Sequence, residues 1–493
     1  MIVVTIHERT LGAARRRLAG LARGAGMVEL RLDDLADQDW QVLLQETTLP
    51  VLVTCRGRLS GGRFDGPEEA RLAVLRQALQ AGVARVDLES GTPAEDLIQE
   101  WPGDRLVLSH HEFRPGTQGL EEHLGRLLSS PGDIVIKLAF MARRTSDALL
   151  ARKWLRRTRA AGRAAVILPM GEEGIPARIL APSWGAAWTY AAPDGAAPAA
   201  PGQLPLSQMA GLYDVDNIGP DAVLTGILGS PVTASLSPWM HNRGLRNLGI
   251  AGCYLPFATS DAADLLLNAS AWGLHGLSVT HPHKEVVLPW LDDLSDTARR
   301  CGAVNTLSFA GGGIQGENTD GEAACRALEE ALPHDWQWPG RKVAIVGAGG
   351  ASRAVGWALG RRQAVVTLYS RDAAQGERTA AAIGALHRDL KTLGDDTREI
   401  LIHATPVGTW PNHDVCLLGS RELKADLVFD LVSNPRETLL LRRAASEGCS
   451  TLGGLSMLVR QGEAQFHLWH GEKPSPGCFM AAALEGLRYQ VGK

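Results

Sequence analysis

The chain has 493 residues, of which 45% are hydrophobic and 21% charged, and its formal net charge is −4. This length exceeds what a single compact core supports, so two or three domains are expected. The small negative charge gives no reason to expect nucleic acid or an anionic membrane as partner, and no apolar run is long enough to span a bilayer. The seven cysteines are scattered, which argues against a zinc site or a disulfide framework and favours a reducing, cytoplasmic location.

Short β-rich runs alternate with amphipathic stretches through residues 1–213. The expected strands lie at 2–6, 27–32, 51–55, 84–89, 106–110, 134–138, 164–168 and 186–190. Eight strands in a strand–helix rhythm predict a (β/α)8 barrel, with a doubly wound open sheet as the structural alternative. Residues 191–205 are rich in Ala, Pro and Gly and have the composition of a linker, although they contain the tripeptide PGQ.

The C-terminal ends of the expected barrel strands carry polar side chains, where such barrels place their chemistry. These residues are Glu29, Arg31, Arg56, Glu89, His110, His111, Lys137 and Met170. Lys137 has apolar neighbours along the chain, and desolvation is expected to lower its pKa and make its amine nucleophilic. A solvated surface lysine is the alternative, but the histidines and arginines at neighbouring strand ends favour the nucleophile.

Seven segments of this half occur in the order typical of one enzyme family. They are VELRLD (28–33), TCR (54–56) with GG (61–62), VDLE (86–89), SHHEF (109–113), IKLAF (136–140), PMGEEGIPAR (169–178) and APGQ (200–203). Together they resemble type I 3-dehydroquinate dehydratase over residues 1 to about 213. The resemblance implies a metal-free mechanism in which Lys137 forms an imine with the substrate ketone and His111 acts as general acid and base.

The same resemblance implies the residues that bind the substrate. Arg178 would pair with the carboxylate, and Gln203 would close over the ring from the segment of linker composition. Glu29, Arg31 and Arg56 would hold the ring hydroxyls and the charge network. Only one of His110 and His111 should face the site because adjacent strand residues point in opposite directions, and the following Glu-Phe identifies His111.

This half also departs from the family pattern. Ser60 stands where the family usually has a glutamate that supports the catalytic histidine. The partner that orients His111 is therefore open between Glu89 and Glu112. Ala177 and Ala199 stand where the family often has serine, and each lost hydroxyl removes a hydrogen bond worth about 1 kcal/mol.

The second half opens with a strand at Val223 and polar residues that follow it. Ser235 and Ser237 lie two residues apart, so in an extended segment their hydroxyls would face the same side and could grip a carboxylate. A helix N-cap is the alternative for these serines. Thr280 and Lys284 follow in VTHPHKE, and further candidates are Asn305 in GAVNT and Asp320 in NTDG.

Residues 341–360, RKVAIVGAGGASRAVGWALG, run from a strand through a glycine turn into an Ala-rich helix. This context makes the glycine motif a candidate nucleotide-binding turn of a Rossmann-type domain. Further strands are expected at 364–370, 400–404 and 426–432.

These motifs, with ATPVG (404–408) and GLSMLVRQGEAQF (454–466), resemble shikimate dehydrogenase from about residue 222 to the C-terminus. The resemblance implies that Lys284 and Asp320 form the acid/base pair, that Ser235 and Ser237 bind the carboxylate, and that Thr280, Asn305 and Gln461 hold the ring hydroxyls. It implies NADP as cofactor, with contacts from Gly347, Ala348, Gly349, Gly350, Ala351 and Thr405 and a 2′-phosphate site at Ser370 and Arg371. His281 and Ser433 depart from the family's usual aliphatic residue and tyrosine.

We therefore expect a fusion of two consecutive enzymes. The expected divisions are a barrel at 1–213, a linker at 214–221, a substrate domain at 222–325 completed by 455–493, and an NADP-binding domain at 326–454. The expected partners are the small-molecule substrates, with no nucleic acid and no membrane, in a monomer or homodimer. The alternatives are a barrel without activity beside a working dehydrogenase, and a ligand-binding sensor built on both folds.

Overall fold

The computed structural model describes residues 1–37, 39–309 and 311–491. The chain divides into two compact units. The first comprises residues 1–223 and 251–273, and the second comprises residues 224–250 and 274–493.

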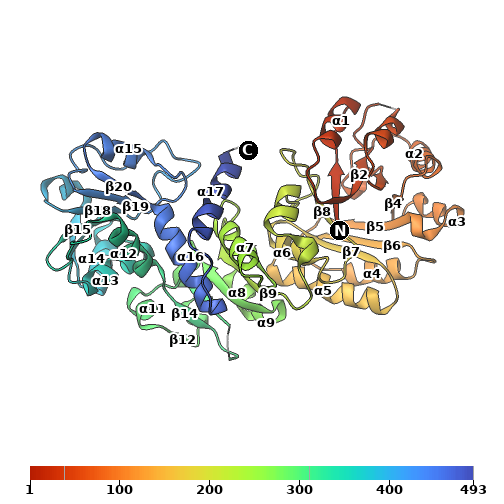
Figure 1. Ribbon diagram of the computed structural model, residues 1–493. Coiled ribbons are helices and arrows are strands. Elements are labelled where there is room, and N and C mark those ends of the chain that lie inside the picture. The colour runs from red at the N-terminus through yellow and green to blue at the C-terminus, as the bar shows by residue number, and fades with distance from the viewer. Residues whose placement is uncertain (38, 310, 492–493) are drawn as a thin grey trace. The chain divides into compact units, whose positions relative to one another are not determined.

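The first unit contains a nearly closed barrel of eight strands (Figure 1). The strands are β1 (Ile2–Ile6), β2 (Ala25–Arg31), β3 (Val51–Thr54), β4 (Arg85–Glu89), β5 (Leu106–Glu112), β6 (Val135–Met141), β7 (Ala165–Met170) and β8 (Thr189–Ala191). Their order is β7-β6-β5-β4-β3-β2-β1-β8, and neighbouring strands pair in parallel. Consecutive strands are neighbours from β1 to β7, and β8 pairs with β1, so the predicted barrel is confirmed and the doubly wound alternative, which requires a reversal of strand order, is wrong.

Helices connect the strands of the barrel. They are α1 (Leu11–Ala19), α2 (Glu68–Gln80), α3 (Leu97–Glu100), α4 (Leu120–Leu128), α5 (Thr145–Ala160) and α6 (Ile175–Leu180). In α4 the buried residues Leu120, Leu124 and Leu127 recur at helical spacing, which turns one apolar face inward. Val3, Val107 and Trp188 belong to a buried cluster within the barrel.

A segment distant in sequence completes the first unit. Residues 251–273 contain β10 (Gly252–Ala258), α8 (Ala262–Leu267) and α9 (Ala269–Trp272). The carboxylate of Asp264 accepts hydrogen bonds from the Thr145 hydroxyl (2.7 Å) and from the backbone N–H (2.9 Å) and hydroxyl (2.5 Å) of Ser146. These donors lie at the start of α5, where backbone N–H groups lack partners within the helix.

The second unit begins with a mixed sheet in which β9 (Val223–Gly229), β11 (Leu274–Val279), β13 (Thr306–Ser308), β14 (Gln315–Glu317) and β12 (Asp293–Leu294) follow one another. Its helices include α7 (Ser237–Asn247), α10 (His283–Val286), α11 (Asp296–Cys301), α12 (Asp320–Ala331), α16 (Gly454–His470) and α17 (Cys478–Val491). Buried Met240, Phe466 and Phe479 join α7, α16 and α17 in one apolar core, so the C-terminal helices complete this part of the unit.

A six-stranded parallel sheet forms the rest of the second unit (Figure 1). Its order is β17 (Leu386–Asp389), β16 (Val365–Ser370), β15 (Lys342–Val346), β18 (Ile400–His403), β19 (Leu427–Asp430) and β20 (Ser450–Gly453). The order reverses between β15 and β18, which is the switch point of a Rossmann sheet and the place where such sheets bind dinucleotides. The connecting helices include α13 (Gly350–Arg361), α14 (Ala373–Ile383) and α15 (Leu439–Ser446). Among the described residues, no helix is long and apolar enough to cross a membrane.

Candidate active sites

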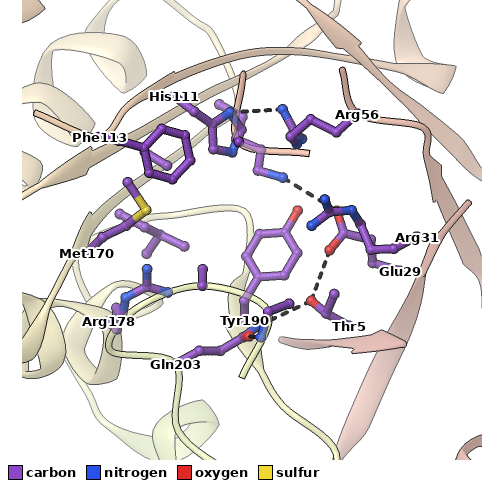
Figure 2. Close-up of a pocket in the computed structure, with 16 residues that line it drawn as sticks. Thr5, Glu29, Arg31, Arg56, His111, Phe113, Met170, Arg178, Tyr190 and Gln203 are labelled. Atoms are coloured by element: carbon purple, nitrogen blue, oxygen red, sulfur yellow. Dashed lines mark hydrogen bonds and ion pairs between the residues drawn. The ribbon is translucent and has the colours of Figure 1, made fainter. Parts of the chain in front are cut away.

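A cavity with an empty volume of about 580 Å³ opens at the C-terminal ends of the barrel strands (Figure 2). Its lining brings together most of the barrel residues singled out from the sequence. These are Glu29, Arg31, Arg56, His111, Lys137, Met170, Arg178 and Gln203. Glu29 and Arg31 share β2 and the others come from separate strands, helices or loops, so the barrel topology makes them neighbours.

Lys137 lies on β6 with its side chain buried in this cavity. Its Nζ donates a hydrogen bond to Asp87 Oδ2 at 2.9 Å and lies 3.5 Å from Glu29 Oε1. Burial opposes the charged form, but the attraction of these carboxylates outweighs it and raises the pKa of Lys137 above its usual value. The expectation of a lowered pKa is therefore wrong, because the residues that decide it lie on other strands.

Asp87 anchors this charge network. Its carboxylate contacts Arg56 Nη2 at 3.0 Å and accepts a hydrogen bond from Ser109 Oγ at 2.6 Å. Burial favours the neutral acid, but Arg56 and Lys137 prevail and lower the pKa of Asp87 to about 2. Asp87 was not among the candidate site residues, although its place inside VDLE on an expected strand was the available signal.

His111 also faces the cavity, and its Nδ1 lies 2.9 Å from Arg56 Nη1. A guanidinium only donates, so Nδ1 accepts and the proton of the neutral ring is assigned to Nε2. Burial and then the charge of Arg56 hold the pKa of His111 well below its usual value. The ring is therefore uncharged at neutral pH.

Neither carboxylate considered as the partner of His111 contacts its ring. Glu89 instead accepts a hydrogen bond from the Gly57 backbone (3.2 Å) and pairs with Arg71 (2.7 Å), and it lies 3.7 Å from Arg56 Nη1. Glu112 pairs with Arg114. Arg56 therefore orients His111 directly, and Glu89 helps to fix Arg56.

His110 points elsewhere, as expected for a strand neighbour of His111. Its ring stacks on His123 with a centroid distance of 3.7 Å. Burial lowers the pKa of His110 to about 4, so this ring is also uncharged at neutral pH.

Arg178 supplies a cationic group that no protein carboxylate neutralises. Its Nε donates to the carbonyl oxygen of Pro169 at 2.7 Å, and no carboxylate within the described ranges lies within ion-pair distance of its guanidinium. Burial lowers the pKa of Arg178 to about 10, which still leaves it charged at neutral pH. A buried guanidinium directed into a cavity (Figure 2) suits an anionic ligand.

Gln203 reaches the cavity from the segment that has linker composition. Its Nε2 donates to Thr5 Oγ1 at 3.2 Å, and its Oε1 accepts from the Ala199 backbone at 3.0 Å. Gly202 has φ +75°, and a Cβ there would lie 2.3 Å from the Gly171 carbonyl oxygen, so only glycine permits this approach. The linker interpretation is wrong for these residues, which close one side of the cavity.

Glu29 and Arg31 lie on β2 but have different partners. Glu29 accepts hydrogen bonds from Thr5 at 2.9 Å and Thr54 at 2.8 Å. Burial opposes its ionisation, but Lys137 and Arg31 lower its pKa. Arg31 makes two parallel hydrogen bonds to Asp33, at 2.7 and 2.8 Å.

The second unit assembles its own cluster of polar side chains. Lys284 on α10 pairs with Asp320, the first residue of α12, where the helix dipole favours a carboxylate. Asn305 Nδ2 donates to Asp320 Oδ1 at 2.7 Å and lies 3.3 Å from Gln461 Oε1 on α16. The structure thus connects four of the predicted residues from four separate segments.

Ser235, Ser237 and Thr280 are placed differently. Ser237 is the first residue of α7, and its backbone N–H donates to Ser235 Oγ at 3.2 Å. The expected extended segment is wrong, because Leu236, the N-cap of α7, has helical angles and Ser235 lies one residue before it. Thr280 follows β11 and donates its backbone N–H to the Leu228 carbonyl oxygen at 2.9 Å, which places it beside the end of β9.

The turn between β15 and α13 has the form of a phosphate cradle. Gly347 has φ +116°, and a Cβ there would lie 2.8 Å from the Ala404 carbonyl oxygen. A Cβ on Gly349 would meet nothing within 4 Å, so a ligand can approach the backbone at the start of the helix. Ala348 lies in the same turn, Gly350 begins α13, and Ala351 is its second residue. The turn fits the pyrophosphate of a dinucleotide.

Two further sites lie at strand ends of this sheet. Ser370 ends β16, and its hydroxyl donates to the Asp372 carbonyl oxygen (2.7 Å) and lies 3.0 Å from His387 Nε2. Arg371 follows Ser370 and is exposed. Thr405 Oγ1 lies 2.6 Å from His403 Nε2, while His403 Nδ1 lies 2.9 Å from Asp430 Oδ1. His387, His403 and Asp430 were not among the predicted residues.

The fold and the sites define a class of protein: a barrel with a buried lysine, followed by an α/β dehydrogenase with a dinucleotide turn. Comparison with known proteins agrees with this class. Residues 2–220 match the type I 3-dehydroquinase family, residues 227–307 the shikimate dehydrogenase substrate-binding domain, and residues 454–484 the shikimate 5'-dehydrogenase C-terminal domain.

Individual relatives extend the comparison. The bifunctional 3-dehydroquinate dehydratase/shikimate dehydrogenase of Arabidopsis thaliana is 31% identical over 479 residues, which cover 92% of this chain and 79% of the relative. The NADP(+) shikimate dehydrogenase of Thermococcus kodakarensis is 41% identical over 54% of this chain and 97% of its own. A crystal structure of shikimate dehydrogenase in complex with NADP+ superposes with a TM-score of 0.51 at 31% identity and covers 55% of this chain and 97% of that chain. The chain belongs to the family of bifunctional 3-dehydroquinate dehydratase/shikimate dehydrogenases.

Proposed function

We propose that the chain dehydrates 3-dehydroquinate to 3-dehydroshikimate in the barrel and reduces 3-dehydroshikimate to shikimate with NADPH in the second unit. The observation that carries the proposal is the pair of lysine sites: the buried Lys137 between Asp87 and Glu29, and the partly exposed Lys284 paired with Asp320. Similarity to the bifunctional Arabidopsis enzyme over 92% of the chain supports both activities in one protein.

In the dehydratase site, Lys137 would form an imine with the substrate ketone. The ammonium and the protonated imine carry the same charge, so Asp87 and Glu29, which hold the ammonium, stabilise the intermediate equally well. The protonated imine draws electrons from the adjacent carbon, which then loses a proton more readily. Arg178 would bind the substrate carboxylate, and Glu29, Arg31 and Arg56 would hold its hydroxyls.

His111 would move the protons of the elimination. With Arg56 donating to Nδ1, Nε2 carries the proton and can deliver it to the departing hydroxyl. Abstraction by Nε2 requires the other tautomer, in which Arg56 gives up this hydrogen bond. Arg56 keeps its contacts to Asp87 and Ser109 in that case, so the exchange leaves it anchored.

In the dehydrogenase site, Lys284 and Asp320 would protonate the C3 oxygen, and Asn305 and Gln461 would orient the ring hydroxyls. Ser235 and Ser237 at the start of α7 would bind the carboxylate, with Thr280 beside them. NADPH supplies the hydride when bound. The pyrophosphate of the cofactor would bind to the β15–α13 turn. The 2′-phosphate would bind to Arg371 and Ser370, and Thr405 would contact the cofactor from the end of β18.

The proposed divisions are a barrel at 1–213, a linker at 214–221, a substrate domain at 222–325 with 455–493, and an NADP-binding domain at 326–454. The proposal includes a cytoplasmic location and a monomer or homodimer without nucleic-acid or membrane partners. The two sites act on consecutive small molecules, and neither needs a metal.

One assay tests both halves. Purified protein is mixed with 3-dehydroquinate and NADPH, and the absorbance of NADPH is followed, with 3-dehydroshikimate as parallel substrate. We expect NADPH loss from both substrates. Lys137→Ala should abolish the signal from 3-dehydroquinate only, and Lys284→Ala should reduce it from both, so each variant serves as folding control for the other half.

The assay also separates the alternatives. NADPH loss from 3-dehydroshikimate alone would mean an inactive barrel, and the replacement of glutamate by Ser60 would be the first cause to test. NADPH loss from neither substrate, with ligand binding retained, would favour a sensor.

A further inference from the structure

Tyr190 lines the dehydratase cavity and has no assigned role there. It lies on β8, its side chain is 5% exposed, and its hydroxyl proton meets no acceptor among the described residues, whereas its oxygen lies close enough to Lys137 for hydrogen bonding to counteract the rise in pKa that burial causes. A buried hydroxyl proton without an acceptor is costly, so this proton is expected to meet an acceptor when a ligand fills the cavity.

The hydroxyl belongs to the immediate surroundings of Lys137. The ammonium lies over the tyrosine ring, 4.6 Å from its centroid, with Asp87 and Glu29 on its other sides. Figure 2 shows the Tyr190 hydroxyl directed into the cavity towards the side of Glu29 and Arg31, whereas Arg178 lies on the other side of the ring. The hydroxyl is therefore placed for the part of a ligand that meets Lys137 and not for a carboxylate held by Arg178.

Of the three neighbours of the Lys137 amine, Asp87, Glu29 and Tyr190, it is Tyr190 that can donate a hydrogen bond to a ligand. The lowered pKa values of Asp87 and Glu29 keep both carboxylates ionised at neutral pH, and an ionised carboxylate only accepts hydrogen bonds. Burial raises the pKa of Tyr190 to about 12, against the opposing charge of Lys137, so its hydroxyl keeps its proton. When an amine adds to a ketone, the carbonyl oxygen gains negative charge and requires a donor close to the attacking nitrogen.

We propose that Tyr190 Oη donates a hydrogen bond to the carbonyl oxygen of the keto substrate while Lys137 Nζ adds to the carbonyl carbon. This inference rests on the proposed dehydratase function. It assigns Tyr190 to formation of the imine and leaves the later elimination to His111.

The step balances without another reagent. Lys137 Nζ first passes one proton to Asp87 Oδ2, 2.9 Å away, which frees the lone pair of the amine. The C–N bond then forms and the π pair of the carbonyl moves to oxygen. The oxygen takes up the proton from Asp87 and a second one from the nitrogen, and the C–O bond breaks as water leaves. The ammonium starts with three protons, two of which depart with the oxygen, and the third stays on the protonated imine. Tyr190 keeps its own proton throughout, as a donor to the oxygen until water leaves.

The test compares Tyr190→Phe with wild type. Phenylalanine retains the ring beneath the ammonium and removes only the hydroxyl. We expect an approximately 100-fold loss in kcat/KM for 3-dehydroquinate and a similar loss in the rate at which borohydride traps the imine on Lys137, read by mass spectrometry. The deuterium isotope effect at the carbon that loses its proton should shrink towards one on kcat/KM, because imine formation then limits the rate.

Two controls accompany the variant. Tyr213→Phe removes a hydroxyl from another buried tyrosine of the same unit that does not line the cavity, and it should leave trapping unchanged. The dehydrogenase activity of the Tyr190→Phe protein reports on its integrity.

Unchanged trapping in Tyr190→Phe, or a slower turnover with an undiminished isotope effect, would overturn the assignment, because the hydroxyl would then act after the imine or not at all. If wild type itself neither turns over 3-dehydroquinate nor is trapped at Lys137, the dehydratase proposal fails and this inference fails with it. Wild-type trapping therefore distinguishes the two failures.

Discussion

The buried charges of the barrel cavity depend on one another. Asp87 touches both Lys137 and Arg56, and the side chains of all three are nearly inaccessible to solvent. Removing one member of such a group leaves an uncompensated buried charge, which is far more destabilising than loss of a surface pair. The same contacts hold the amine that reacts and the guanidinium that orients His111.

Asp87→Asn should therefore destabilise the first unit, with a clear pH dependence. The folded pKa of Asp87 is lowered to about 2, so its contribution of about 2 kcal/mol is present above the unfolded pKa and is lost as pH falls through the folded value. Urea unfolding, followed by dehydratase activity and fluorescence, should show a difference in the free energy of unfolding between wild type and variant at pH 7. This difference should become smaller towards pH 3. The exposed Asp104→Asn is the matched control. A difference that does not change with pH would contradict the ion-pair explanation.

The lowered pKa of His111 predicts the shape of the dehydratase pH profile. Because burial and Arg56 keep the ring neutral, kcat/KM should hold its level as pH falls through 6.5 and decline only well below it. Arg56→Gln removes one of these causes, so the acidic limb should move to higher pH even though overall activity falls.

His110→Gln, outside the cavity, should leave that limb in place. An acidic limb near 6.5 in wild type that Arg56→Gln does not move would assign it to a different group.

At the scale of elements, strand ends and helix starts carry the chemistry of both units. In the Rossmann sheet, the close approach of Gly347 to Ala404 ties the turn after β15 to the end of β18. This contact fixes the path of the backbone into α13. The free backbone N–H groups at the start of that helix are the groups that bind the phosphates of a dinucleotide in such folds.

Gly347→Ala should impair cofactor binding more than fold stability elsewhere. A Cβ at φ +116° is strained and would meet the Ala404 carbonyl oxygen at 2.8 Å, so the turn must shift. We expect a loss of at least 10-fold in NADP affinity, about 1.4 kcal/mol, measured by calorimetry.

Gly360→Ala is the control within α13. A Cβ there meets only the Ile383 carbonyl oxygen at 3.8 Å, and alanine favours the helix. Its affinity should equal that of wild type. Equal losses of NADP affinity in Gly347→Ala and Gly360→Ala would show that the geometry of the turn does not cause the weaker binding.

At the scale of the whole molecule, the first unit contains more than the barrel. Residues 251–273 belong to it, and Asp264 accepts three hydrogen bonds from Thr145 and Ser146 at the start of α5. The barrel therefore depends on a segment that follows it in the chain by about 30 residues.

Asp264→Ala should lower the stability of the first unit by about 2 kcal/mol, because it leaves the α5 donors without their acceptor. The measurement is the urea midpoint for loss of dehydratase activity. The exposed Asp133→Ala should change it by less than about 0.5 kcal/mol. A fragment of residues 1–223 should be destabilised in the same direction, and a fragment as stable as the whole chain would contradict this dependence.

The barrel strands, β9, four strands of the Rossmann sheet (β15, β16, β18 and β19) and the positions of the motifs were predictable from the sequence, because apolar runs, glycine turns and short polar motifs are local patterns. Strand alternation also predicted that only one of His110 and His111 faces the cavity, and the resemblance of the following Glu-Phe to the family motif selected His111. The family resemblance supplied the expected roles of Lys137, Lys284 and Asp320.

Only the tertiary structure decided the charge state of Lys137, the partner of His111 and the place of the Tyr190 hydroxyl beside Lys137. Each depends on atoms brought together from other strands: Asp87 lies 50 positions from Lys137, and Arg56 lies 55 from His111. Burial and Coulomb interactions act through space, so sequence neighbours cannot reveal them. For the same reason, the attachment of residues 251–273 to the barrel is a property of the folded molecule.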